Sequence, residues 1–141
     1  MADFVFTRGI AELFKADTDL DTADLRVLLL TSTYTQNKDN NFVADLGNEL
    51  TVGGYARQTL TGETVTEDDA NDQVYLDAND PLFAALATGE TIGWMVLFRQ
   101  TGADATAPVL CAYDVTNTPT NGSDVTVQFA APASGAALRG V

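Results

Sequence analysis

Carboxylates are the only side chains in this sequence that are numerous enough to support chemistry. The chain has 20 acidic residues, 7 basic residues and no His. Without His, the chain lacks the commonest general base, every Ser–His or Cys–His nucleophile pair and the commonest transition-metal ligand. No glycine-rich loop leads to a Lys-Ser or Lys-Thr pair, so no phosphate-binding loop is recognised either. An enzyme made from this chain would have to work with carboxylates alone.

The first acidic cluster has the spacing that opens a calcium-binding loop. Asp17, Asp19 and Asp21 fall at every second position, as the first three ligands of such a loop do. The sixth position of the loop is Thr22 where Gly is needed, and the twelfth is Leu28 where a bidentate Glu is needed. We therefore interpret the cluster as a solvated acidic turn, with calcium binding as the alternative.

The second acidic cluster covers residues 67–72, with Asp77 and Asp80 further along the chain. Its oxygen atoms could hold a divalent ion, although a lone acidic loop is more often only solvated. A carboxylate pair of the glycosidase type is a further alternative, but one Trp and no aromatic-rich segment give little basis for a sugar cleft. The sequence predicts no catalytic residue, no metal site and no cofactor, and therefore a protein that is not an enzyme.

The net charge of −13 limits the partners that this chain can bind. An acidic surface repels nucleic acid and anionic membranes, and no basic stripe is present to replace phosphate counterions. The N-terminus lacks a secretory signal, and the longest apolar run, residues 94–98, is far shorter than the roughly 20 residues that span a bilayer. The single Cys111 lies in an apolar segment, where we expect a small buried hydrophobe.

The N-terminal segment, residues 1–16, is expected to form the one clear helix of the chain. Phe6, Ile10, Leu13 and Phe14 recur at helical spacing and make one apolar stripe. We predict that this stripe packs on a sheet of the same chain. The alternative is that the helix binds a partner.

The rest of the chain indicates strands separated by turns. Residues 25–31 are apolar on both faces and predict a central strand, and residues 92–98 predict another, with Ile92, Trp94, Val96 and Phe98 on one face. Further strands are expected at 55–60, 63–66, 74–76, 108–115 and 124–129, a turn at 116–123, and short helices at 42–46 and 82–87. The predicted fold is mainly β with minor α: an antiparallel, sandwich- or barrel-like single domain with one N-terminal helix. The Gly/Ala-rich residues 130–141 are expected to form a C-terminal arm that becomes ordered on a partner, or else a loose terminus.

Several motifs, taken in their order and spacing, resemble a family of small virion proteins of tailed bacteriophages. They are RVLLLTSTY at 26–34, NEL at 48–50 with GYAR at 54–57, VTEDDAND at 65–72, FRQTG at 98–102 and TPTNGSDVTVQF at 118–129. No single motif is diagnostic, but together they cover nearly the whole chain. The Ala/Gly-rich ending departs from the family, whose members tend to end in a polar or Trp-containing segment.

The resemblance implies a structural protein of the head-decoration or cement type. We expect it to bind the outer surface of the major capsid protein lattice, to stabilise the head, and to contact further copies of itself. Its expected location is the capsid surface of the virion, after assembly in the host cytoplasm. The docking residues expected from their position and apolarity are Phe4, Val5, Phe6, Leu138 and Val141.

The alternative function is a tail- or fibre-associated structural or adhesin module. Such a module would present exposed aromatic side chains in its loops, for which the sequence offers Tyr34 and Tyr55.

Overall fold

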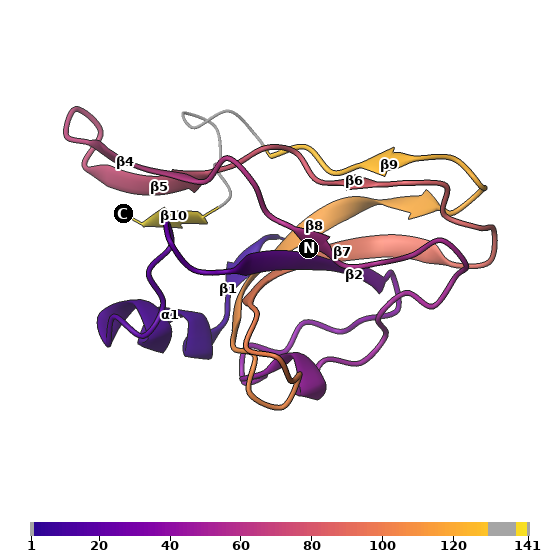
Figure 1. Cartoon of the computed structure of the whole chain (residues 1–141), viewed down its shortest axis with the longest axis horizontal. Helices are drawn as coiled ribbons and strands as arrows, with labels where there is room; N and C mark the ends of the chain where they lie inside the picture. The colour runs from indigo at the N-terminus through magenta and orange to yellow at the C-terminus, as the bar shows by residue number, and fades with distance from the viewer. Residues whose placement is uncertain (1, 130–137, 141) are drawn as a thin grey trace.

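The computed structural model describes residues 2–129 and 138–140 and has a mainly β fold built from antiparallel sheets (Figure 1). The predicted class, mainly β with a helix near the N-terminus, is confirmed. In chain order, the elements are β1 (Phe4–Val5), α1 (Thr7–Phe14), β2 (Leu25–Thr31), the 3-10 helix η1 (Val43–Asp45), β3 (Gln58–Thr59), β4 (Thr64–Asp68), β5 (Gln73–Asp77), β6 (Leu82–Phe83), β7 (Thr91–Arg99), β8 (Val109–Pro119), β9 (Val125–Thr126) and β10 (Leu138–Gly140).

A five-stranded sheet with the order β1-β8-β7-β2-β3 forms the centre of the fold. The predicted central position of residues 25–31 is confirmed, because β2 lies between β7 and β3. Val27 and Leu29 of β2 point into one apolar cluster, while Leu28 and Leu30 point into another on the opposite face. The strand is apolar on both faces because both faces of the sheet are covered.

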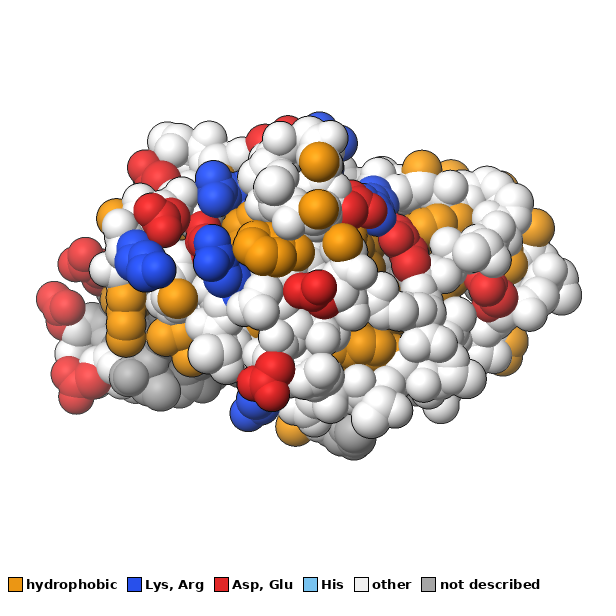
Figure 2. Space-filling model, turned by 90° about the horizontal axis from the view of Figure 1, so that it is seen from below, with side chains coloured by type: hydrophobic (Ala, Val, Ile, Leu, Met, Phe, Trp, Pro, Cys, Tyr) orange, Lys and Arg blue, Asp and Glu red, His pale blue; other side chains and the backbone are white. Residues whose placement is uncertain are grey.

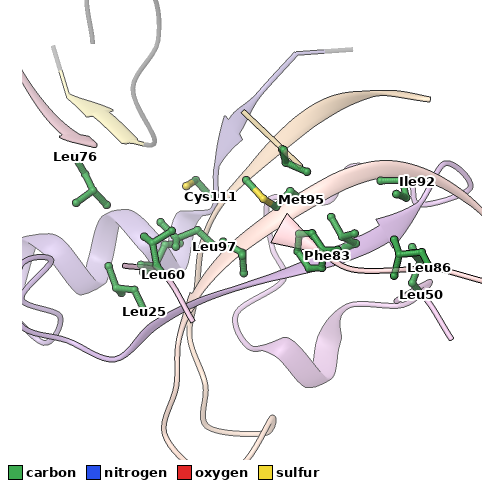
Figure 3. Close-up of a cluster of buried hydrophobic side chains, with 14 residues drawn as sticks. Leu25, Leu50, Leu60, Leu76, Phe83, Leu86, Ile92, Met95, Leu97 and Cys111 are labelled. Atoms are coloured by element: carbon green, nitrogen blue, oxygen red, sulfur yellow. The ribbon is translucent and has the colours of Figure 1, made fainter. Parts of the chain in front are cut away.

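The first cluster fills the space between the central sheet and an outer layer. That layer consists of the sheets β10-β5-β4 and β6-β9, which lie above the central sheet in Figure 1. Leu76 of β5, Phe83 of β6 and Met95 of β7 all belong to this cluster, which Figure 3 shows extending along the central sheet. This packing of two layers through one apolar core is sandwich-like.

The second cluster lies on the opposite face of the central sheet and is built around Trp94. Phe4 and Tyr34 pack edge-on against the indole, with ring centroids 5.7 and 6.0 Å away. Phe6 and Val43 are buried in the same cluster. Trp94 is therefore a core residue, as its strand position predicts, and β1 and η1 supply much of the cover for this face.

One residue of β7 faces the side opposite to the prediction. The ladder between β7 and β8 is irregular between Ile92 and Trp94, so Ile92 joins Met95 in the first cluster while Trp94 faces the second. Gly93 makes this irregularity possible, because a Cβ at that position would lie 2.5 Å from the Cα of Ser32. The predicted grouping of Ile92 with Trp94 on one face is wrong for that reason.

The segment at 82–87 does not form the predicted helix. Leu82 and Phe83 form β6 and pair with β9, with Phe83 buried and Leu82 exposed. Ala85 has a φ of 49°, a left-handed conformation that a right-handed helix cannot contain. The turn is also shorter than the predicted range 116–123, since β8 continues to Pro119, which pairs with Thr91.

The N-terminal segment contains a strand as well as a helix. Residues 4 and 5 pair with β8, and α1 begins only at Thr7. The predicted packing of the apolar stripe on the sheet is wrong for its three helical members, because Ile10, Leu13 and Phe14 are 43%, 36% and 89% exposed. The side of α1 that faces the sheet carries Gly9 and Glu12.

Gly9 determines how closely α1 approaches the sheet. A Cβ at this position would overlap the backbone carbonyl of Leu110 in β8. Only a residue without a side chain allows this close approach between helix and strand. None of the helices in the described ranges has the length and apolar character needed to cross a bilayer.

The substitution Gly9→Ala is expected to lower the free energy of unfolding by about 2 kcal/mol, because the new methyl group must displace the β8 backbone. Urea unfolding measures the change. Helix propensity alone predicts the opposite sign, a gain of about 1 kcal/mol. Gly47→Ala is the control, since a Cβ there has no neighbour within 4 Å. A Gly9→Ala protein more stable than wild type would refute the close-contact argument.

Candidate assembly surface

The docking residues expected from the sequence are placed mostly inside the molecule or beyond the described part. Phe4 and Phe6 are 6% and 0% exposed, and Val5 packs against the first cluster. Leu138 pairs through its backbone with Leu76, and Val141 lies outside the described residues. Docking through residues 4–6 stays a prediction, and it would require β1 to leave the sheet.

The apolar helix face is the most prominent exposed apolar feature near the N-terminus. We give this name to Ile10, Leu13 and Phe14 on the solvent side of α1, where Leu13 and Phe14 follow Ile10 by one helical turn. Phe14 is 89% exposed, which is unusual for a large aromatic side chain. The helical spacing in the sequence identifies these residues, but it does not tell which side of the helix faces the core.

A buried carboxylate holds the polar side of α1 against the sheet. The Glu12 side chain is fully buried, and its Oε1 lies 2.7 Å from Nη2 of Arg8. Its Oε2 accepts hydrogen bonds from Arg99 at the end of β7 (3.1 Å) and from the Thr18 hydroxyl (2.8 Å). The carboxylate thus connects the helix, the central sheet and the turn after the helix. Burying a charge of this kind requires such partners.

The beginning of α1 is held as well. The Phe6 amide donates to the carbonyl of Leu110 (3.0 Å), and the Thr7 amide donates to the carbonyl of Lys38 (3.2 Å). The guanidinium of Arg8 lies 5.0 Å from the centre of the Phe42 ring, within the range of a cation–π contact. The apolar helix face is therefore presented by a helix fixed at its N-terminal end and along its polar side.

Basic side chains gather around α1 although the chain as a whole is strongly acidic. Figure 2 shows blue side chains at the end of the molecule where α1 lies in Figure 1, with apolar side chains between them. Four of the seven basic residues lie in this region: Arg8, Lys15, Lys38 and Arg99. Lys15 and Lys38 are exposed. Exposed Asp17 and Asp39 lie next to these lysines, and Figure 2 shows red side chains at the same end, so the surface around α1 combines apolar contact area with charges of both signs.

A second surface is uniformly acidic. We call residues 63–77, which contain β4, β5 and their turn, the acidic hairpin. The hairpin has no basic residue and six acidic ones: Glu63, Glu67, Asp68, Asp69, Asp72 and Asp77. Val65 and Val74 are 43% and 44% exposed, and the register Val65↔Leu76 and Glu67↔Val74 places both valines and Glu67 on one face of the hairpin.

Some of the acids weighed as cation ligands have hydrogen-bond partners within the chain. Asp21 donates its backbone amide to the Asp19 carboxylate (3.4 Å), and contact with Asp21 lowers the pKa of Asp19. Asp68 accepts from the Asn71 side chain (2.8 Å) and so closes the hairpin turn. Among the described residues, no group of three or more Cys, Asp or Glu side chains is arranged to hold a metal ion.

The carboxylates around a surface hollow of about 410 Å³ also serve the fold. Glu90 accepts from the amide and hydroxyl of Thr51 (2.7 and 3.0 Å). Glu49 accepts from the Tyr55 hydroxyl and from Arg57, each at 2.7 Å. Arg57 also binds Asp104 (2.7 Å), which lowers the pKa of that carboxyl. The hydrogen bonds of these acids join separate loops of the chain.

Cys111 lies on β8 and belongs to the first cluster, so its prediction as a buried hydrophobe is confirmed. Burial raises the pKa of its thiol to about 12, and the Tyr113 hydroxyl lies 2.9 Å from the sulfur. A thiol with this pKa is almost entirely protonated at neutral pH and is a poor nucleophile.

No family model, curated protein or solved structure matches this chain.

Native Cys111 is expected to resist an aromatic disulfide reagent at pH 8 and to react fully once the protein is unfolded in guanidinium, since both burial and the raised pKa oppose thiolate formation. The absorbance of the released thiolate measures the reaction. Labelling of the folded protein at the rate of a free thiol would contradict the core assignment.

Glu12→Gln is expected to lower the free energy of unfolding by about 3 kcal/mol, because it removes the buried negative charge that pairs with the partly exposed guanidinium groups of Arg8 and Arg99. Hydrogen exchange should also become faster in residues 7–14. The control is Asp24→Asn, which removes the ion pair between Asp24 and Arg26. Because these side chains are 46% and 36% exposed, the free energy of unfolding should change by less than about 1 kcal/mol. Equal losses in the two variants would count against the proposed anchoring of α1.

Proposed function

We propose that this chain is a structural protein of a tailed-phage virion that decorates the capsid. It binds the outer surface of the major capsid protein lattice, stabilises the head and performs no catalysis. The observation that carries the proposal is the apolar helix face, an exposed apolar surface on a helix fixed to the core. The motif resemblance supplies the phage context, and the face supplies a surface for assembly.

A fixed helix suits a protein that assembles in many copies. Because Glu12 and Gly9 already hold α1 in place, little conformational entropy is lost when Phe14 is covered by a partner. A small contact area for each copy is sufficient on a lattice, since repeated weak contacts add up to high avidity. The apolar helix face is small, as this mode of binding permits.

The charge of the chain also agrees with an exterior location. A net charge of −13 repels nucleic acid and keeps a densely covered particle soluble. The exposed apolar residues of α1 favour an orientation with α1 at a protein contact and the acidic hairpin toward solvent.

The alternative, a tail- or fibre-associated adhesin, finds less support in the described loops. Tyr34 is 5% exposed and packs edge-on against Trp94. The Tyr55 hydroxyl accepts from the Leu29 amide (3.0 Å) and donates to Glu49. Both rings contribute to the interior and do not form a platform for a host-surface ligand.

Purified protein mixed with undecorated heads of its phage should cosediment saturably and raise the melting temperature of the particles. Phe14→Ser should weaken this binding roughly tenfold or more, because the exposed ring is the largest side chain of the apolar helix face. Leu82→Ser is the matched control, since Leu82 is 48% exposed but lies on β6, outside both surfaces. Absence from heads, with the protein found in isolated tails, would overturn the proposal in favour of the tail alternative.

A further inference from the structure

We propose that Asn121 is a self-modification site, and that the folded chain protects it until the turn between β8 and β9 opens. The side chain reacts with the backbone amide of Gly122, forms a cyclic imide and ends as aspartate or isoaspartate. The reaction needs only water, so it is independent of the proposed capsid function and can be measured on the chain alone.

The residue pair itself supplies the chemistry. Asn121 is the one asparagine in the sequence that glycine follows. The Gly122 nitrogen loses its proton and bonds to the side-chain carbonyl carbon of Asn121, the bond from that carbon to the side-chain nitrogen breaks, and ammonia leaves with a proton from water. Water then opens the imide at either carbonyl, with no oxidant or reductant required. Glycine favours ring closure because it has no side chain to block the approach.

Solvent reaches the reacting groups. Asn121 and Gly122 are both exposed in the turn that follows β8. Gly122 has a φ of 90°, a conformation that favours glycine over other residues, so the turn itself requires the reactive pair to end in glycine. Exposure gives hydroxide access to the amide, and any protection must therefore come from the hydrogen bonds of the turn.

One hydrogen bond occupies the nucleophile. The Gly122 amide donates to the carbonyl of Leu86 (2.7 Å), a buried residue of the loop before β7, and the Leu86 amide donates to the carbonyl of Ser123 (3.2 Å). The Gly122 nitrogen must leave this bond before it can lose its proton and attack Asn121. The Ser123 amide donates to Oδ1 of Asn121 (3.0 Å), which draws electrons from the carbonyl carbon and favours attack. Protection therefore depends on the bond to Leu86.

Further hydrogen bonds hold the same turn on both sides. Oδ1 of Asp124 accepts from the Ala85 amide (2.8 Å). The buried Thr120 donates its amide to the carbonyl of Glu90 (2.9 Å), and its hydroxyl oxygen accepts from the Glu90 amide (3.2 Å). Separation of the turn from residues 84–87 breaks several of these bonds together, so the open state is a minor one. In Figure 1 the turn lies at the end of the molecule away from α1, so a partner on the apolar helix face does not cover it.

The modification changes the contact that delayed it. Isoaspartate lengthens the backbone between residue 121 and Gly122 by one methylene group, which moves the Gly122 amide away from the Leu86 carbonyl. Either product also adds a negative charge close to Asp124 in the sequence. A modified turn therefore docks less well on residues 84–87, and the change is not reversed when the turn closes.

A comparison of the folded and unfolded chain tests the protection. At mildly alkaline pH, Asn121 of the native protein should lose its amide roughly tenfold or more slowly than Asn121 of the chain in guanidinium. Tandem mass spectrometry of peptides from the turn measures the rate from the mass gain at this residue. Asn117 is the internal control, because it is also exposed but precedes Thr118, whose side chain hinders ring closure. It should keep its amide in both samples.

A matched pair of variants tests the opening step. Asp124→Ala removes the acceptor of the Ala85 amide and should speed the reaction in the folded protein by roughly tenfold. Asp124→Asn keeps an oxygen acceptor at this position and should stay closer to wild type. Hydrogen exchange in β2 should be unchanged in both, which separates opening of the turn from global unfolding. Asn121→Ser, which cannot form the imide, should show no mass gain at the turn.

Reaction of the native protein at the rate of the unfolded chain would overturn the inference, because the bond to Leu86 would then give no protection. So would an unchanged rate in folded Asp124→Ala, or an Asn121 that keeps its amide in guanidinium. The comparison of native and unfolded wild type decides the question even where Asp124→Ala fails to fold. Binding to heads enters none of these measurements, so the capsid proposal stands or falls separately.

Discussion

The orientation of α1 depends on a single buried carboxylate. Glu12 needs counter-charges where it is buried. Arg8 supplies one from the preceding turn of the same helix, and Arg99 supplies the other only if this side of the helix faces the end of β7. Gly9 on the same side removes the steric obstacle to close approach. The helix therefore turns its polar side inward, and the apolar residues that would ordinarily cover a sheet face outward. The exposed position of the apolar helix face is a direct consequence of this inversion.

The inversion is possible because the sheet does not need the helix as a cover. One face of the central sheet is buried by the outer layer, and the other is closed by Phe4 and Phe6 together with the segment that contains Tyr34 and Val43. An amphipathic helix in a protein of this size usually gains its stability from burying its apolar stripe. Here ion pairs and backbone hydrogen bonds hold the helix, and the stripe is left for another molecule.

The sequence predicts the parts of the fold that depend on local periodicity. The strand at 25–31 and the buried Trp94 follow from apolar patterns that have one consistent explanation. The errors fall where tertiary contacts override the pattern: a bulge at Gly93 turns Ile92 to the other face, and a helical stripe at Ile10 faces solvent. The ion partners of Glu12 include a residue 87 positions away, so no local window could reveal the inversion.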